Sequence, residues 1–210
     1  MPAHASITAR LAKATWPLSV TFKLISLTSQ VVVRDATGQT VCLVKMKAFK
    51  LKEQVQVWAD ENKEEPLAEI KADNILDFSG CYSLSDAVGG QLGAVRRHGM
   101  RSFWKTHYEV MLGREREVRF EITEENPGAK LGDGLLSMIP LGAVVSGFLF
   151  HPRYGAKSAA GEVVMRLKKE AAFFEGKFSM EKVKSDLALE DEGALLLSFL
   201  MMVLLERQRG

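Results

Sequence analysis

The chain has 210 residues, of which 47% are hydrophobic and 26% are charged, and this balance is typical of a globular protein with one large domain or two small ones. The formal net charge of +2 is too small to indicate a nucleic-acid partner by itself. Two cysteines far apart in the sequence, Cys42 and Cys81, indicate free thiols in a reducing compartment and argue against a disulfide framework.

Residues 1–17 contain no continuous apolar segment of the kind found in a secretory signal. We therefore expect a short flexible or helical lead-in, and a cytoplasmic protein. A single domain is expected to fill residues 18–210.

Pairs of short strands, joined by turns that open with aspartate, are predicted after the lead-in. The predicted pairs are Gln30–Arg34 with Val41–Met46, Gln54–Ala59 with Pro66–Lys71, and Tyr82–Ser85 with Leu92–Arg96. Asp35, Asp60 and Asp86 open the three turns at a spacing of roughly 25 residues, which indicates an internal repeat. A fourth copy is predicted at Glu162–Leu167, after a turn at Ser158–Gly161.

Each returning strand ends on basic residues and is followed by a link that contains aromatic residues. Regularly spaced short strands with turn signals are typical of an all-β barrel or sandwich, and we expect the aromatic side chains of the links to point inward. These aromatic residues are Phe49, Phe78, Phe103, Trp104, Phe173 and Phe174.

An insertion is predicted between the third and fourth copies, at residues 127–153, after one further strand at Glu115–Ile122. Its segment Gly134–Pro152 contains no formally charged residue, but Pro140 interrupts it, and proline inside a helix costs about 3 kcal/mol. A segment that covers or docks onto the protein is the favoured interpretation, with a membrane-contacting loop as the alternative.

The stretch Ala194–Leu205 is apolar except for Ser198, so a helix there would be hydrophobic on every face and must be surrounded. It would span about 18 Å at 1.5 Å per residue, whereas a bilayer core is about 30 Å thick. We therefore predict a buried central helix at about residues 191–207. Its expected core residues are Leu195, Leu196, Phe199, Leu200, Met202 and Val203.

The chain resembles the tubby C-terminal-like superfamily, and within it the branch that contains the LURP-one-related proteins and the phospholipid scramblases. The motifs that carry the resemblance are Phe22–Leu27, Val31–Asp35, Lys45–Leu51, Ile75–Gly80, Gly93–Arg97, Phe173–Phe178 and the terminal apolar helix. The resemblance implies a mainly β fold, a closed antiparallel barrel of about twelve strands wrapped around a central hydrophobic C-terminal α-helix, which agrees with the need of a small barrel for a filled interior.

Members of this superfamily are associated with phosphoinositide binding, with lipid scrambling or, in many LURP-one-like and bacterial members, with no assigned biochemistry. The first two groups make a lipid the ligand that the resemblance implies. The phosphoinositide-clamping residues of tubby have no matching positions here. The chain also lacks the cysteine cluster, the proline-rich arm and the acidic calcium segment of scramblases, which makes scramblase-like activity the weaker alternative.

The densest basic patch of the sequence comprises Arg96, Arg97, Arg101 and Lys105, with aromatic residues among them. Four permanent cations beside aromatic rings suit an anionic headgroup, and the competing interpretation is a solvated barrel rim. His98 and His107 have no nucleophile in an elbow motif nearby in sequence, and the four histidines show no metal-ligand spacing. We expect no catalytic residue, no metal and no cofactor.

The sequence thus favours a non-catalytic module that binds anionic phospholipid or phosphoinositide at a membrane surface. A structural or protein-interaction scaffold, with a protein partner or a second copy docked on residues 134–150, is the alternative. We expect no nucleic-acid partner, and a cytoplasmic location with peripheral membrane association.

Overall fold

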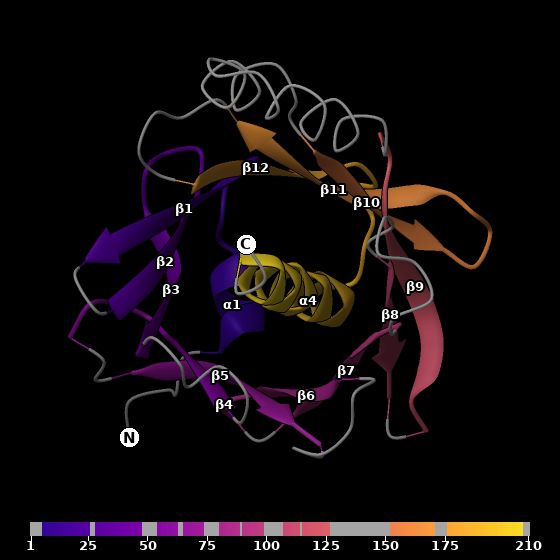
Figure 1. The fold of residues 1–210 in the computed structure, drawn as a ribbon, viewed down its shortest axis with the longest axis horizontal. Helices are drawn as coiled ribbons and strands as arrows, with labels where there is room; N and C mark the ends of the chain where they lie inside the picture. The colour runs from indigo at the N-terminus through magenta and orange to yellow at the C-terminus, as the bar shows by residue number, and fades with distance from the viewer. Residues whose placement is uncertain are drawn as a thin grey trace, which may run out of the picture.

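The computed structural model describes residues 6–25, 28–47, 54–62, 65–73, 80–88, 90–98, 107–113, 115–126, 152–170 and 176–207. These residues form a closed barrel of twelve antiparallel strands with a long helix inside it (Figure 1). Each strand pairs with its neighbours in sequence, and β1 closes the ring by pairing with β12. The predicted fold class, a closed antiparallel barrel around a C-terminal helix, is confirmed. The strands are β1 (Leu18–Ile25), β2 (Thr28–Arg34), β3 (Thr40–Lys47), β4 (Gln54–Trp58), β5 (Pro66–Ala72), β6 (Cys81–Asp86), β7 (Gln91–Arg97), β8 (His107–Leu112), β9 (Glu117–Glu124), β10 (Arg153–Ser158), β11 (Val163–Glu170) and β12 (Gly176–Lys182).

The turns that the sequence predicts at Asp35, Asp60 and Asp86 are all present. In each turn the aspartate carboxylate accepts a hydrogen bond from the backbone N–H two residues further on, which is the bonding that favours aspartate in turns. The donors are Thr37 at 2.9 Å, Asn62 at 2.9 Å and Val88 at 3.3 Å. The fourth predicted turn, Ser158–Gly161, is closed by a hydrogen bond from the Gly161 N–H to the Ser158 carbonyl at 2.8 Å.

The hairpins β2–β3, β4–β5, β6–β7, β8–β9 and β10–β11 turn at the same end of the barrel, and each has a register shift in its strand pairing. The shifts lie between Val33 and Arg34, Val57 and Trp58, Leu84 and Ser85, Val110 and Met111, and Ala156 and Lys157. Bulges of this kind increase local twist and are common at barrel rims. The repeat unit is thus a bulged hairpin. The hairpin β8–β9 is a further copy, although the sequence indicates only one strand there.

The barrel has two mouths, named here after the ends of the central helix. At the N-mouth lie the beginning of that helix and the turns that follow β2, β4, β6, β8 and β10. At the C-mouth lie the end of the helix and the ends of β1, β3, β5, β7, β9 and β11. The aromatic residues of the links and the segment 134–150 belong to the C-mouth connections in sequence, and they lie outside the described residues.

The central helix α4 (Leu189–Arg207) fills the barrel (Figure 1). All residues from Asp191 to Leu204 are buried, so the helix has no exposed face over this length. The six expected core residues are among them, and Val203 is the most exposed of the six at 7%. The polar Ser198 is accommodated because its hydroxyl donates to the Ala194 carbonyl of the same helix at 2.7 Å.

A short helix, α1 (Ile7–Leu11), lies inside the ring of strands (Figure 1). At the N-mouth it packs against the beginning of α4, where Ile7 and Thr8 lie close to Gly193. The sequence analysis treats this segment as part of a lead-in, but Ile7 and Leu11 belong to the hydrophobic core. The segment is tied to three successive N-mouth turns. Thr8 donates to Asp86 at 3.3 Å, the Thr15 N–H donates to Asp35 at 3.2 Å, and Arg10 pairs with Glu65 at 3.4 Å.

Candidate functional site

Basic residues gather at the C-mouth because four of the six strands that run toward it, β3, β5, β7 and β11, carry lysine or arginine at or near their ends. The described residues of this kind are Lys45, Lys71, Arg96, Arg97, Lys168 and Lys169. The other two of the six strands, β1 and β9, end on Ile25 and Glu124. The N-mouth turns open instead with the carboxylates of Asp35, Asp60 and Asp86. The C-mouth is therefore the end of the barrel at which an anionic ligand meets favourable charge.

Arg96, the first of the predicted binding residues, lies on the outer face of β7 and is neutralised there. Its Nε donates to the Glu109 carboxylate at 3.0 Å, and His98 Nε2 donates to the other oxygen of Glu109 at 2.6 Å. Burial alone would raise the pKa of Glu109, but the hydrogen bonds from Arg96 and His98 together hold that pKa below its ordinary value. Arg96 therefore forms a structural ion pair on the outer face of the barrel wall.

Arg97, the second predicted residue, is turned to the inner face by the alternation of the strand. It is paired in register with Tyr108, and its guanidinium carbon lies 6.0 Å from the centre of the Tyr108 ring. Tyr82 lies on the neighbouring strand β6, in register with Val95 of β7. Burial raises the pKa of its hydroxyl, and the positive charge of Arg97 opposes that rise. Arg97 thus forms an inward cation–aromatic group at the C-mouth.

The predicted patch is accordingly divided in the structure. Arg96 and Arg97 lie on opposite faces of the barrel wall, while Arg101 and Lys105 lie outside the described residues. Of the two predicted cations among the described residues, one therefore faces outward and the other faces inward.

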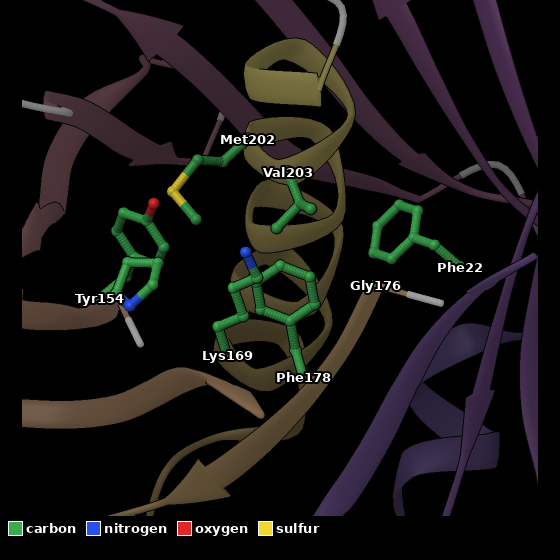
Figure 2. A pocket seen from close by; sticks show the side chains of 8 residues that line it. Phe22, Tyr154, Lys169, Gly176, Phe178, Met202 and Val203 are labelled. Atoms are coloured by element: carbon green, nitrogen blue, oxygen red, sulfur yellow. The ribbon is translucent and has the colours of Figure 1, made fainter. Parts of the chain in front are cut away.

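The feature that the sequence analysis missed is a cavity of about 350 Å³ at the C-mouth, beside the end of α4 (Figure 2). Its described lining comes from β1, β10, β11, β12 and the last turns of α4. The lining residues are Phe22, Pro152, Tyr154, Lys169, Gly176, Phe178, Met202 and Val203. Phe22 and Phe178 stand edge to face with ring centres 5.7 Å apart, and both are buried.

Lys169 is the one charged residue among the described residues that line this cavity. It faces inward because Met165 and Leu167, at alternate positions of β11, are core residues. Its neighbour Lys168 lies on the opposite, outer face and is exposed. The alternation of Met165, Leu167 and Lys169 was the available signal, since it continues an apolar inner face with a lysine.

Glu124 is an acidic residue on the same inner face, at the register position opposite Tyr154 of β10. It does not line the cavity. The inner face of the C-mouth thus carries Arg97 and Lys169 as cations, with Glu124 on the strand between them.

Two histidines on the outer wall, His98 and His107, stack with ring centres 4.8 Å apart. Each faces a carboxylate, Glu109 at 2.6 Å and Glu121 at 3.6 Å. Even so, the described side chains include no group of three or more His, Cys, Asp or Glu residues arranged to hold a metal ion. The cluster also includes no nucleophile, and its observed contacts are ion pairs and ring stacking across the β7–β8–β9 sheet.

A second hollow, of about 560 Å³, lies at the N-mouth and carries charges of both signs. Among its lining residues Arg119 pairs with Asp191 at 3.5 Å, and burial raises the pKa of Asp191 against the influence of Arg119. Lys184, Glu162 and Asp186 also line this hollow. Because its charges are mixed and partly paired, it shows no preference for a ligand of one charge.

Both cysteines are free thiols, as the sequence predicts. Cys42 is fully buried on the inner face, and this burial raises the pKa of its thiol to about 12. Cys81 is half-buried on the outer face, where burial and the neighbouring Asp73 raise the pKa of its thiol to about 11. Neither thiol is activated as a nucleophile, because a raised pKa disfavours the reactive thiolate.

Comparison with protein-family models, with curated proteins and with solved structures gave no match. Within the described part of the chain, no helix combines the length and the apolarity that crossing a bilayer requires.

Proposed function

We propose that this chain is a non-catalytic module that binds anionic phospholipid at a membrane surface through the C-mouth of its barrel. The observation that carries the proposal is the set of exposed basic residues at the strand ends around this mouth. Anionic membrane surfaces attract basic segments at about 1 kcal/mol for each lysine or arginine near the surface. The resemblance of the sequence motifs to the tubby C-terminal-like superfamily supports the same ligand class.

The distribution of charge gives the proposed binding an orientation. Lys71 and Lys168 are exposed at C-mouth strand ends, whereas aspartates open the turns of the N-mouth. A barrel of this kind approaches an anionic surface with its C-mouth first, because this orientation brings its cations nearest to the negative potential.

Vesicle co-sedimentation tests the proposal. Wild-type protein should sediment with vesicles that contain anionic lipid, and binding should fall as salt rises. The variant Lys71→Glu with Lys168→Glu should bind several-fold more weakly, because both side chains are exposed at the C-mouth. The matched control, Lys13→Glu with Lys184→Glu, makes the same change in net charge at exposed N-mouth positions and should bind like the wild type. Absence of binding at low salt, or equal losses in the two variants, would refute the proposal.

One observation favours a second function, self-association through the N-mouth. The large hydrophobic side chains that are exposed in the described structure all lie at this mouth, on its turns or at the ends of its elements. They are Val88, Val118, Val183 and Leu189. Light scattering over a range of concentrations tests this candidate, and a monomer at every concentration would exclude it.

A further inference from the structure

The cavity at the C-mouth has the composition of a site for a single hydrocarbon chain. Its described walls present the aromatic rings of Phe22, Phe178 and Tyr154, and the side chains of Met202 and Val203 rise from α4 at its base (Figure 2). Ligand pockets in proteins generally measure about 300–1,000 Å³. A volume of about 350 Å³ lies at the lower end of that range, and it favours a ligand with one chain over a lipid with two.

A cavity with apolar walls of this kind either remains empty or binds an apolar ligand. The rings of Phe22 and Phe178 hold each other edge to face, which gives the wall a defined shape. Tyr154 and Phe178 are 6% and 8% exposed, so the walls are already buried without a ligand and need little rearrangement to receive one. Burial of each further methylene group in such a site is worth about 0.8 kcal/mol, which is about fourfold in affinity.

Lys169 specifies the polar end of the ligand. Its register partner on β12 is Phe178, and its backbone N–H is bound to the Pro152 carbonyl at 3.0 Å, which fixes its position on the cavity wall. In Figure 2 the Lys169 side chain extends alongside the Phe178 ring, on the side of the cavity where Val203 lies. Among the described contacts Lys169 forms no ion pair, and no acidic residue is among the described lining. A half-buried ammonium group beside an apolar chamber suits a ligand with a carboxylate at the end of its chain.

We propose that this cavity binds the carboxylate of a single-chain fatty acid as a monomer, with the chain between Phe22, Phe178 and α4 and the carboxylate paired with Lys169. The exposed strand ends invoked for membrane binding are separate from this cavity. The two proposals therefore fail independently, since vesicle binding requires Lys71 and Lys168 and fatty-acid binding requires Lys169.

Titration of the full chain with dodecanoate, below its micelle concentration and without vesicles, tests the proposal. Calorimetry should show saturable binding of one molecule per chain. From octanoate to dodecanoate the affinity should rise by about fourfold per methylene until the chain fills the cavity. Dodecanol should bind more weakly than dodecanoate, because it offers no charge to Lys169.

Two variants separate the head and the chain of the ligand. Lys169→Gln should weaken dodecanoate binding by about tenfold to a hundredfold, the effect of removing a charged hydrogen bond, and should leave dodecanol binding unchanged. Lys168→Gln is the matched control, because this neighbouring lysine is exposed on the outer face, and it should bind dodecanoate like the wild type. Val203→Phe, which fills the cavity from α4, should weaken both ligands.

Circular dichroism and thermal unfolding show whether each variant is folded, and the chain-length series on wild-type protein holds even if Val203→Phe does not fold. The proposal is wrong if dodecanoate shows no saturable binding. It is equally wrong if Lys168→Gln and Lys169→Gln reduce the affinity to the same extent.

Discussion

Arg96 and Arg97 are adjacent in sequence, yet the pleat of β7 turns their guanidinium groups to opposite sides of the barrel wall. The outer one is bound by Glu109, and the inner one lies over Tyr108. Adjacent cations on an uninterrupted strand point to opposite faces, so a pair that is close in sequence is divided in space. Lys168 and Lys169 show the same division on β11, where only the inner lysine reaches the cavity.

The ionised Glu109 should stabilise the fold in a way that depends on pH. Its pKa is lowered in the folded state, so the stabilisation is fully present above its ordinary value of 4.5 and is lost as pH falls through the folded pKa. Glu109→Gln should therefore lower the free energy of unfolding by about 1 kcal/mol at neutral pH, and the difference from wild type should vanish in acid. Chemical denaturation of wild type and Glu109→Gln, at neutral pH and at pH values well below 4.5, measures the difference.

Glu121→Gln is the matched control for this prediction. Glu121 is more exposed, with 54% of its side chain accessible, and it lies 3.6 Å from His107. Its replacement should change stability less at every pH. A difference between wild type and Glu109→Gln that stays constant with pH would contradict the linkage argument.

Gly93 occupies a position where a side chain cannot be placed without moving the backbone. Its φ is +153°, and a Cβ would overlap the Met111 carbonyl of β8 and lie 3.1 Å from Leu112 Cδ2. Gly93→Ala should therefore destabilise the fold by about 2–3 kcal/mol, as strain and overpacking do. Thermal unfolding measures the loss. Gly38→Ala, with φ of +89° but open space around its Cβ, separates backbone strain from steric overlap and should cost less.

At the scale of the elements, the hairpins that open with aspartate were predictable because turn chemistry and strand alternation agree there. The strand β12 was also predictable in principle, since Phe178 and Met180 alternate with Lys177 and Ser179. Strand β10 was harder to recognise, because Gly155 and Ala156 carry little hydrophobic signal. The turn between β8 and β9 lacks an opening aspartate, so the sequence predicted the second strand of that hairpin, β9, without its first strand, β8.

Helix α1 could not be predicted as part of the core from local pattern. It has five residues, and its position depends on contacts with turns that lie 20 to 78 residues away in the sequence. The cavity could not be predicted from local sequence pattern either, because its described lining comes from five separate elements. The cationic residues that line the mouth could be recognised as strand ends, but their side of the wall required an assignment of register.

Gly193 allows α1 to pack against α4, and its replacement should separate them. A Cβ at this position lies 3.2 Å from Thr8 Cγ2 and 3.7 Å from Ile7 Cγ2, so a leucine side chain has no space. Gly193→Leu should cost about 2 kcal/mol in stability and expose Arg10 to trypsin. Gly193→Ala is the control and should be nearly neutral, because better helix propensity offsets the close contact. Equal trypsin resistance in wild type and Gly193→Leu would contradict this packing role.

At the scale of the whole molecule, α4 supplies the interior of the barrel. Deletion of Leu195–Leu205 should abolish cooperative folding, because the inner faces of the strands would then surround a void. Near-ultraviolet circular dichroism and thermal unfolding measure this outcome. The graded control Leu196→Ala should remain folded with a loss of about 3 kcal/mol. A stably folded deletion variant would show that the strands can close without their central helix.

The position of α4 in the sequence has a consequence for how this protein is made. The ribosome synthesises all twelve strands before the helix that they enclose, and β1 must wait for β12 before the ring can close. The nascent chain therefore carries apolar strand faces and unpaired edges until translation of the domain is nearly finished. Such a chain depends on a late, concerted assembly around the newly emerged helix. Until then it is a natural client for chaperones that shield exposed strand edges.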